Sequence, residues 1–194
     1  MRRFSQAISE GDGISLIVPV EDAESARLGE QQGAEGILIA RRVPDLRQGT
    51  TLPILWGGPE SSPEAALGAG ADACLLAVQA VGDGRRLVEL HAQALGLGLE
   101  CVLDVRDDEE LELALEHVDP EIFLLSGRGA EADEEELERV LDLLPDVPAG
   151  KLAIAELSGR GREEVAALER AGIDAVIVAA DSVTELLGGV PPGV

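Results

Sequence analysis

The stretch CVLDVRDDEELELAL, residues 101–115, decides the fold of this chain. Its first five residues form a short, largely apolar run, which is typical of a buried strand. Asp107 and Asp108 follow, and carboxylates are favourable at the positive N-terminal end of a helix. Leucines at helical spacing come next. One strand followed at once by one helix is the repeating unit of a parallel sheet.

Apolar runs of this kind recur eight times along the 194 residues. Polar stretches with helical spacing separate most of them. Strand and helix alternating eight times is the pattern of a closed barrel. We therefore expect an α/β fold, a compact (β/α)8 TIM barrel, with residues 1–194 as a single domain. The eight predicted strands are residues 14–20, 36–40, 52–56, 73–78, 101–105, 122–125, 152–155 and 175–178.

The predicted helices are longer in the second half of the chain than in the first. Residues 84–97 are predicted to form a helix with Leu87, Leu90 and Leu95 toward the sheet. Residues 133–144 and 162–171 are also predicted helices, because their apolar residues have the same spacing. Residues 43–48 leave room for little more than one turn, and a helix at 181–187 is also short. Such helices cover the barrel thinly near strands two, three and eight, so we predict a homo-oligomer whose partner subunit covers this side.

Charge and composition exclude several classes of function. The chain has 38 acidic and 15 basic residues and a net charge of −23, which repels nucleic acids and anionic membranes. A hydrophobic fraction of 45% supports a sizeable core. No stretch approaches the roughly 18 apolar residues of a membrane helix, and no leader is evident, so we expect a cytoplasmic protein.

The cysteines and histidines do not form a metal-binding pattern. Cys74 and Cys101 fall in neighbouring predicted strands, where buried, reduced thiols are the simplest interpretation. His91 and His117 fall on predicted helices. We expect no metal site, no disulfide and no cofactor.

The polar residues that follow each apolar run are the candidate site, because barrel active sites lie at the C-terminal ends of the strands. Five arginines fall at this rim, and guanidinium groups bind phosphate and carboxylate in a bidentate manner. The alternative is that they form internal ion pairs with Glu21, Asp104, Glu156 and Asp181. The five arginines are Arg41, Arg42, Arg106, Arg128 and Arg160.

Other rim features also allow two interpretations. Asp104 and Glu156 are a candidate acid–base pair, or are solvated or paired with arginine. The run SGRGR, residues 158–162, is an anion-binding loop before a helix, or a plain turn. Trp56 stacks on a planar ligand or packs over a loop. The acidic residues 131–138 are most simply a solvated helix face.

Several of these segments together resemble indole-3-glycerol-phosphate synthase, a barrel enzyme of tryptophan biosynthesis. That family closes an indole ring with loss of carbon dioxide, so the resemblance implies a carboxy-lyase on a TIM barrel. The segments are RRFSQAI (2–8), LPILW (52–56), AALGAGADACLLAV (65–78), LHAQALGLGLECVLDVRDDEELELAL (90–115) and IAELSGRGREEVAALERAGIDAVIVA (154–179).

The family's functional residues are only partly retained in this chain. The third-strand lysine, the family's general acid, falls on Gly57, and the first-strand Glu-x-Lys falls on Pro19 and Glu21. The fifth-strand and seventh-strand glutamates correspond to Asp104 and Glu156. The remaining correspondences are Ser126 for an asparagine, Arg128 for an arginine, Leu157 or the shifted Ser158–Gly159 for a serine, and Ala179 for a glycine.

Lys151 is the only lysine of the chain, and it precedes the seventh predicted strand, which places it at the opposite end of the barrel. Arginine cannot replace it as a proton donor, because its pKa exceeds about 12. We therefore expect a non-catalytic or divergent relative. It would bind an anionic small molecule, bearing phosphate or carboxylate, or a protein partner. The candidate ligand-binding residues are Arg106, Ser126, Arg128, Ser158, Gly159, Arg160 and Ser182.

Two enzymatic alternatives remain. One is a working lyase of the family type that uses Asp104 and Glu156, with arginines in place of the lysines. The other is an isomerase or lyase acting on a phosphosugar at the same rim. Such a reaction could not proceed through a Schiff base, because a Schiff base requires a lysine at the rim and none is expected there.

Overall fold

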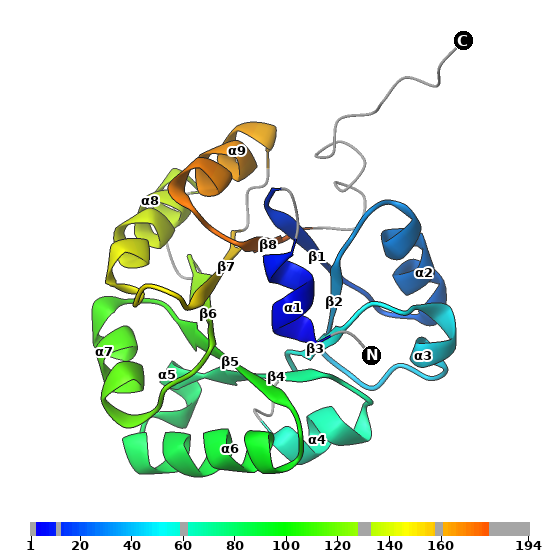
Figure 1. Cartoon of the computed structure of the whole chain (residues 1–194), viewed down its shortest axis with the longest axis horizontal. Coiled ribbons are helices and arrows are strands. Elements are labelled where there is room, and N and C mark those ends of the chain that lie inside the picture. Colours follow the sequence, from blue (N-terminus) through cyan, green and yellow to red (C-terminus); the bar gives the residue numbers. More distant parts are fainter. Residues whose placement is uncertain (1–2, 11–12, 59–61, 128–132, 158–160, 179–194) are drawn as a thin grey trace.

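A computed structural model describes residues 3–10, 13–58, 62–127, 133–157 and 161–178. Eight parallel strands pair in chain order and close into a barrel, because the last strand pairs with the first (Figure 1). This confirms the predicted TIM barrel. The strands are β1 (Ser15–Pro19), β2 (Gly36–Ile39), β3 (Ile54–Trp56), β4 (Ala73–Ala77), β5 (Glu100–Val105), β6 (Ile122–Ser126), β7 (Leu152–Glu156) and β8 (Ala175–Ile177).

The helices form an outer ring, except α1, which lies across one end of the barrel (Figure 1). In the described ranges α3 has four residues and α4 has six, whereas α6 has 13, so the shortening of the first half is as predicted. The predicted helix at 181–187 lies outside the described residues. The helices are α1 (Phe4–Ser9), α2 (Ala23–Gln31), α3 (Leu46–Gly49), α4 (Pro63–Gly68), α5 (Val78–Val81), α6 (Gly84–Gly96), α7 (Asp108–His117), α8 (Asp133–Leu143), the 3₁₀ turn η1 (Leu144–Asp146) and α9 (Arg162–Ala171).

None of the helices in the described ranges combines the length and the apolar character that crossing a membrane requires.

The strands contribute side chains to two hydrophobic clusters, one inside the barrel and one between the sheet and the outer helices. Alternate residues, such as Ile122 and Leu124 of β6, point into the barrel, and the intervening Phe123 and Leu125 pack under the outer helices. Phe4 of α1 belongs to the inner cluster, so this helix closes the barrel at the N-terminal ends of the strands. Continuous apolar strands are therefore needed, because both faces of the sheet are covered.

Two expectations about helix faces are wrong. Leu95 of α6 is 55% exposed, and Ala94 is the residue buried there beside Leu87 and Leu90. Glu136 of α8, which lies within the supposedly solvated acidic run, is buried. It is four residues before the buried Val140, and therefore lies on the same side of the helix.

The two cysteines are free and buried, as predicted, and they face each other across β4 and β5. Burial raises the pKa of the Cys74 thiol to about 12, and burial likewise raises the pKa of Cys101. Neither thiol is therefore activated as a nucleophile.

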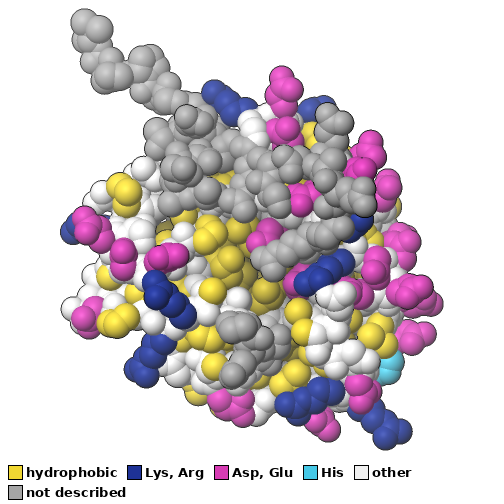
Figure 2. Space-filling model, turned by 180° about the vertical axis from the view of Figure 1, so that it is seen from behind, with side chains coloured by type: hydrophobic (Ala, Val, Ile, Leu, Met, Phe, Trp, Pro, Cys, Tyr) yellow, Lys and Arg dark blue, Asp and Glu magenta, His cyan; other side chains and the backbone are white. Residues whose placement is uncertain are grey.

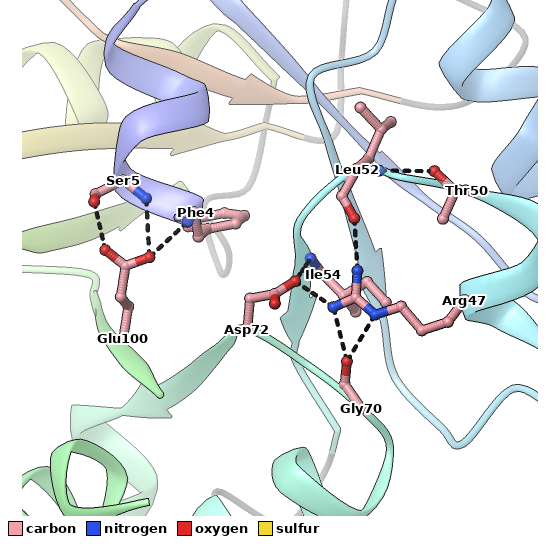
Figure 3. Close-up of polar contacts among 9 residues, drawn as sticks. All are labelled: Phe4, Ser5, Arg47, Thr50, Leu52, Ile54, Gly70, Asp72 and Glu100. Carbon is pink, nitrogen blue, oxygen red and sulfur yellow. Dashed lines mark hydrogen bonds and ion pairs between the residues drawn. The ribbon is translucent and has the colours of Figure 1, made fainter. Parts of the chain in front are cut away.

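A polar network fastens β3 and β4 at the N-terminal end of the barrel (Figure 3). The Asp72 carboxylate accepts a hydrogen bond of 2.7 Å from the Ile54 backbone N–H and forms an ion pair with Arg47. Arg47 also donates to the backbone carbonyls of Leu52 (3.0 Å) and Gly70 (2.8 Å). The network compensates for the short β3, which has only three residues.

A second carboxylate in the same region holds α1 in place. Glu100, at the start of β5, accepts hydrogen bonds from the backbone N–H groups of Phe4 and Ser5 and from the Ser5 hydroxyl (Figure 3). These N–H groups belong to the first turn of α1. The N–H groups of a first turn have no carbonyl acceptors within their own helix, so Glu100 supplies the missing acceptor.

We predict that Asp72→Ala lowers the free energy of unfolding by about 2–4 kcal/mol, because it leaves the buried Ile54 N–H without an acceptor and removes the ion pair of Arg47. Urea unfolding followed by circular dichroism measures this. Arg86→Ala is the control, since it removes an exposed pair with Glu89 and should cost less than about 0.5 kcal/mol. Equal losses in the two variants would contradict the role given to Asp72.

We also predict that Gly127→Ala destabilises the fold by about 1–3 kcal/mol. A Cβ on Gly127, directly after β6, would lie 2.6 Å from the Cβ and 2.9 Å from the Cα of Glu136 in α8. Gly68→Ala is the matched control, because a Cβ there meets nothing within 4 Å. It should be neutral or slightly stabilising, by about 0.5 kcal/mol. Thermal unfolding compares the two, and a Gly127→Ala protein as stable as Gly68→Ala would refute the close approach.

Candidate functional site

Three predicted site residues lie on one wall of the barrel mouth. Asp104, Ser126 and Glu156 occupy the last inward positions of the neighbouring strands β5, β6 and β7, and all three are buried. Ser126 is the register partner of Glu156, whereas the register partner of Asp104 is Leu124, two residues before Ser126. The serine therefore belongs to the strand between the two that carry the carboxylates. This arrangement follows from inward positions alternating along each strand.

The opposite wall is small and apolar. By the same alternation the inward positions here are Pro19 at the end of β1, Gly57 directly after β3, and Ala77 at the end of β4. Leu38 and Leu75 pack on the inner cluster below them and are only partly buried. Figure 2 shows the end opposite α1, where hydrophobic side chains gather in a central hollow surrounded by charged groups.

A side chain at position 57 would be directed into this mouth. A Cβ built on it would lie 2.8 Å from the Cδ1 atom of Leu38 and 3.7 Å from the Cδ2 atom of Leu75. The position at which the resemblance places the general-acid lysine is therefore directed inward, and Leu38 occupies the space next to it.

Lys151 lies at the other end of the barrel, as predicted. It precedes β7 and pairs with Asp119, which precedes β6. The hydrogen bond from Lys151 lowers the pKa of the Asp119 carboxyl. The ammonium group of the chain's single lysine is thus held away from the mouth.

Arg106 lies on the outer side of the rim. Its guanidinium contacts Gln79 of α5, and its backbone N–H donates to Glu110 at 2.9 Å. Burial raises the pKa of Glu110. Arg106 also lines a groove of about 620 Å³ with acidic residues of α7 and α8. The structure therefore separates it from the wall that carries Asp104 and Glu156.

Of the four remaining rim arginines, Arg41 and Arg42 lie within the described residues. Arg41 forms a 3.4 Å ion pair with Glu21 at the surface, which agrees with the ion-pair interpretation for this residue. Arg42 is exposed. The other predicted ligand-binding residues, Arg128, Ser158, Gly159, Arg160 and Ser182, lie outside the described residues.

Trp56 packs in the protein and does not face the mouth. It is buried in the outer cluster, and the backbone of Gly58 lies against its indole ring. Of the two interpretations, packing over a loop is the one that the structure supports.

Sequence reasoning missed the two leucines and Glu136. Leu38 and Leu75 read as ordinary strand residues, and only the closed barrel shows that their upper ends face the mouth. Glu136 could have been found from its spacing with Val140 and Leu143, which are both buried.

The described mouth offers hydrogen-bond acceptors, one hydroxyl and an apolar surface. Among its described inward-facing residues none is basic. Carboxylates can accept hydrogen bonds from hydroxyl or N–H groups of a ligand and can transfer protons. Within the described ranges no cluster of three or more histidine, cysteine, aspartate or glutamate side chains is arranged to hold a metal ion.

Comparison with known proteins agrees with this geometry. The family model described as indole-3-glycerol phosphate synthase matches residues 62–184. Indole-3-glycerol phosphate synthases of two strains of Acidithiobacillus ferrooxidans are each 39% identical over 109 residues, which is 56% of this chain and 41% of theirs. The aligned part of the chain thus spans about two fifths of the length of these relatives.

The family match begins at α4, so β1 to β3 and the Gly57 position lie before it. The matched part includes β4 to β8 and therefore the wall formed by Asp104, Ser126 and Glu156. Because the match covers more than half of the residues and the strands close into the expected barrel, this chain belongs to the indole-3-glycerol phosphate synthase family.

Proposed function

We propose that this chain is a divergent family member whose barrel mouth binds an anionic small molecule and does not carry out the ring closure. The observation that carries this proposal is position 57. It is directed into the mouth, it is a glycine, and the Cδ1 atom of Leu38 lies 2.8 Å from where a Cβ would be. A lysine general acid is what the resemblance requires there.

The loss of the general acid alone has a large effect. Removing such a group lowers a rate by about 100- to 10,000-fold. Lys151 is held by Asp119 at the far end of the barrel, and the guanidinium group of an arginine does not act as a proton donor. Asp104 and Glu156 could still transfer protons, but neither supplies a positive charge to the mouth.

Each part of the proposed ligand would contact a different part of the mouth. Its anionic group, a phosphate or carboxylate, would be held at the rim by arginines, because the buried carboxylates of the inner wall disfavour a second negative charge. Hydroxyl or N–H groups would face Asp104, Ser126 and Glu156. The carbon skeleton would lie on Leu38 and Leu75. We assign the rim role to Arg128 and Arg160, with Ser158, Gly159 and Ser182; Arg106, which contacts Gln79 on the outer side of the rim, is not part of it.

The lyase alternative is tested by turnover. We predict that the purified chain forms no indole-glycerol phosphate from carboxyphenylamino-deoxyribulose phosphate above the uncatalysed rate, as followed by chromatography. An Acidithiobacillus ferrooxidans relative serves as the positive control for the assay. Product formed at about 1 per second or faster, and lost in Glu156→Gln, would show instead that the carboxylate wall is catalytic.

Anion binding is tested by thermal unfolding in phosphate. At a phosphate concentration of about 100 times Kd, we expect a stabilisation of about 2.7 kcal/mol, which raises the Tm by about 5–10 °C in a domain of this size. Sodium chloride at equal ionic strength is the essential control, because any salt screens the repulsion within a chain of charge −23.

The same assay distinguishes phosphate binding by the rim arginines from a general effect of surface charge. Arg128→Ala should remove a substantial part of the phosphate effect, whereas Arg27→Ala, which replaces an exposed arginine on α2, should leave it unchanged. Equal shifts in phosphate and chloride, or equal losses in the two variants, would overturn the proposed anion site.

A further inference from the structure

The helix α6 carries a second apolar stripe on its outer side. Leu87 and Leu90 face the barrel and are buried, which is the usual single stripe of a barrel helix. Val88 and Leu95 nevertheless remain 42% and 55% exposed. α6 forms the outer edge of the molecule beside α4 (Figure 1).

The spacing of the outer stripe is that of a helix-packing surface. Arg85, Val88, Ala92 and Leu95 are separated by three, four and three residues, as in the heptad pattern of paired helices. A single exposed leucine is ordinary, but a stripe with this spacing can pack side by side with another helix. Ala92 is exposed near the middle, and its small side chain permits close approach.

The charges along this face are opposite at its two ends. Arg85 and Arg86 lie in the first turn of α6, where the helix dipole disfavours positive charge, and that turn has no acidic residue. Within the described part of the chain Arg85 forms no ion pair. Asp119 and Glu121 lie at the other end, where they line a cavity of about 500 Å³ together with Leu95; Asp119 is paired with Lys151, so Glu121 is the acidic group available to a partner.

We propose that α6 is a dimer interface, at which α6 packs antiparallel to α6 of a second copy around a two-fold axis near Ala92. Such an arrangement makes the stripe self-complementary, as a two-fold interface requires. Val88 then packs on the partner's Leu95, and Arg85 approaches the partner's Glu121. The cavity beside Leu95, Leu67 and Leu97 gives room for the incoming side chains.

A second copy fits this face because the charges of the face are self-complementary, with Arg85 near one end of α6 and Glu121 near the other. Two molecules of charge −23 repel each other, so they can associate only where that repulsion is locally reversed. α6 has two arginines and one glutamate, whereas α7 has three acidic residues in its first turn alone. The antiparallel arrangement places the basic first turn of each α6 near Glu121 of the other copy, which directly precedes β6.

This interface differs from the one expected from the thin cover near β2, β3 and β8. α6 packs on β4 and β5, on another side of the barrel. The contact would leave the mouth of each barrel open, because it lies on the outer ring of helices (Figure 1).

Sedimentation velocity of the full chain tests the proposal. We expect a species of twice the 20.2 kDa chain mass at micromolar concentration. Ala92→Glu and Leu95→Glu should raise the dissociation constant by at least about 30-fold. Leu28→Glu is the matched control, since Leu28 of α2 is 49% exposed and lies on a different helix, and it should leave the dimer intact.

A charge exchange tests the antiparallel register. Arg85→Glu should weaken the dimer, and adding Glu121→Arg to it should restore association, because the two substitutions re-create the pair between copies with reversed signs. Circular dichroism confirms folding of each variant, and Ala92→Glu, at an exposed position, serves if Leu95→Glu does not fold. A monomeric wild-type chain, a dimer insensitive to the α6 substitutions, or equal weakening by Leu28→Glu would each overturn the proposal.

Discussion

Hydrogen bonds between β1 and β8 close the sheet, and the rest of the structure depends on that closure. The Ser15 N–H donates to the Asp174 carbonyl, and the Val178 N–H donates to the Ile17 carbonyl, each at 2.9 Å. A closed sheet has no free edge and encloses an interior that side chains must fill. Short strands suffice here because α1 fills one end of that interior with Phe4 and Ile8, and Glu100 holds the helix there.

Closure also directs the last inward residue of every strand toward one mouth. The resemblance to the family implies a mouth that carries both a lysine and carboxylates. Here the described positions on β5 to β7 supply acids and a hydroxyl, and those on β1, β3 and β4 supply small or apolar groups. The acidic wall lies within the family match, and Gly57 lies before it.

The charge of the chain shapes both proposals. A strongly acidic molecule can hold an anion only where arginines are gathered, and it can meet its own copy only where its surface is locally basic. The rim arginines are proposed for the first task, and the first turn of α6 for the second. The exposed Val88 and Leu95 then have a physical explanation that a solvated barrel helix does not provide.

The sequence by itself determined the order of strands and helices, because local chemistry marks them. Asp107 accepts a hydrogen bond from the Glu110 N–H at the start of α7, and Gly172 ends α9 in the left-handed conformation, both at the predicted positions. The apolar runs likewise matched the eight strands to within a few residues. The position of Lys151 relative to β7 was enough to place it away from the mouth.

Only the tertiary structure decided which neighbours each side chain meets. Leu95 and Ala94 are adjacent in sequence, and the packing of α6 on the barrel buries the smaller one. Arg106 follows directly on the strand of Asp104, but its contact with Gln79 holds it on the outer rim. Glu136 is buried because α8 lies against Gly127. Such outcomes depend on contacts between segments far apart in the chain, and no local pattern of residues contains them.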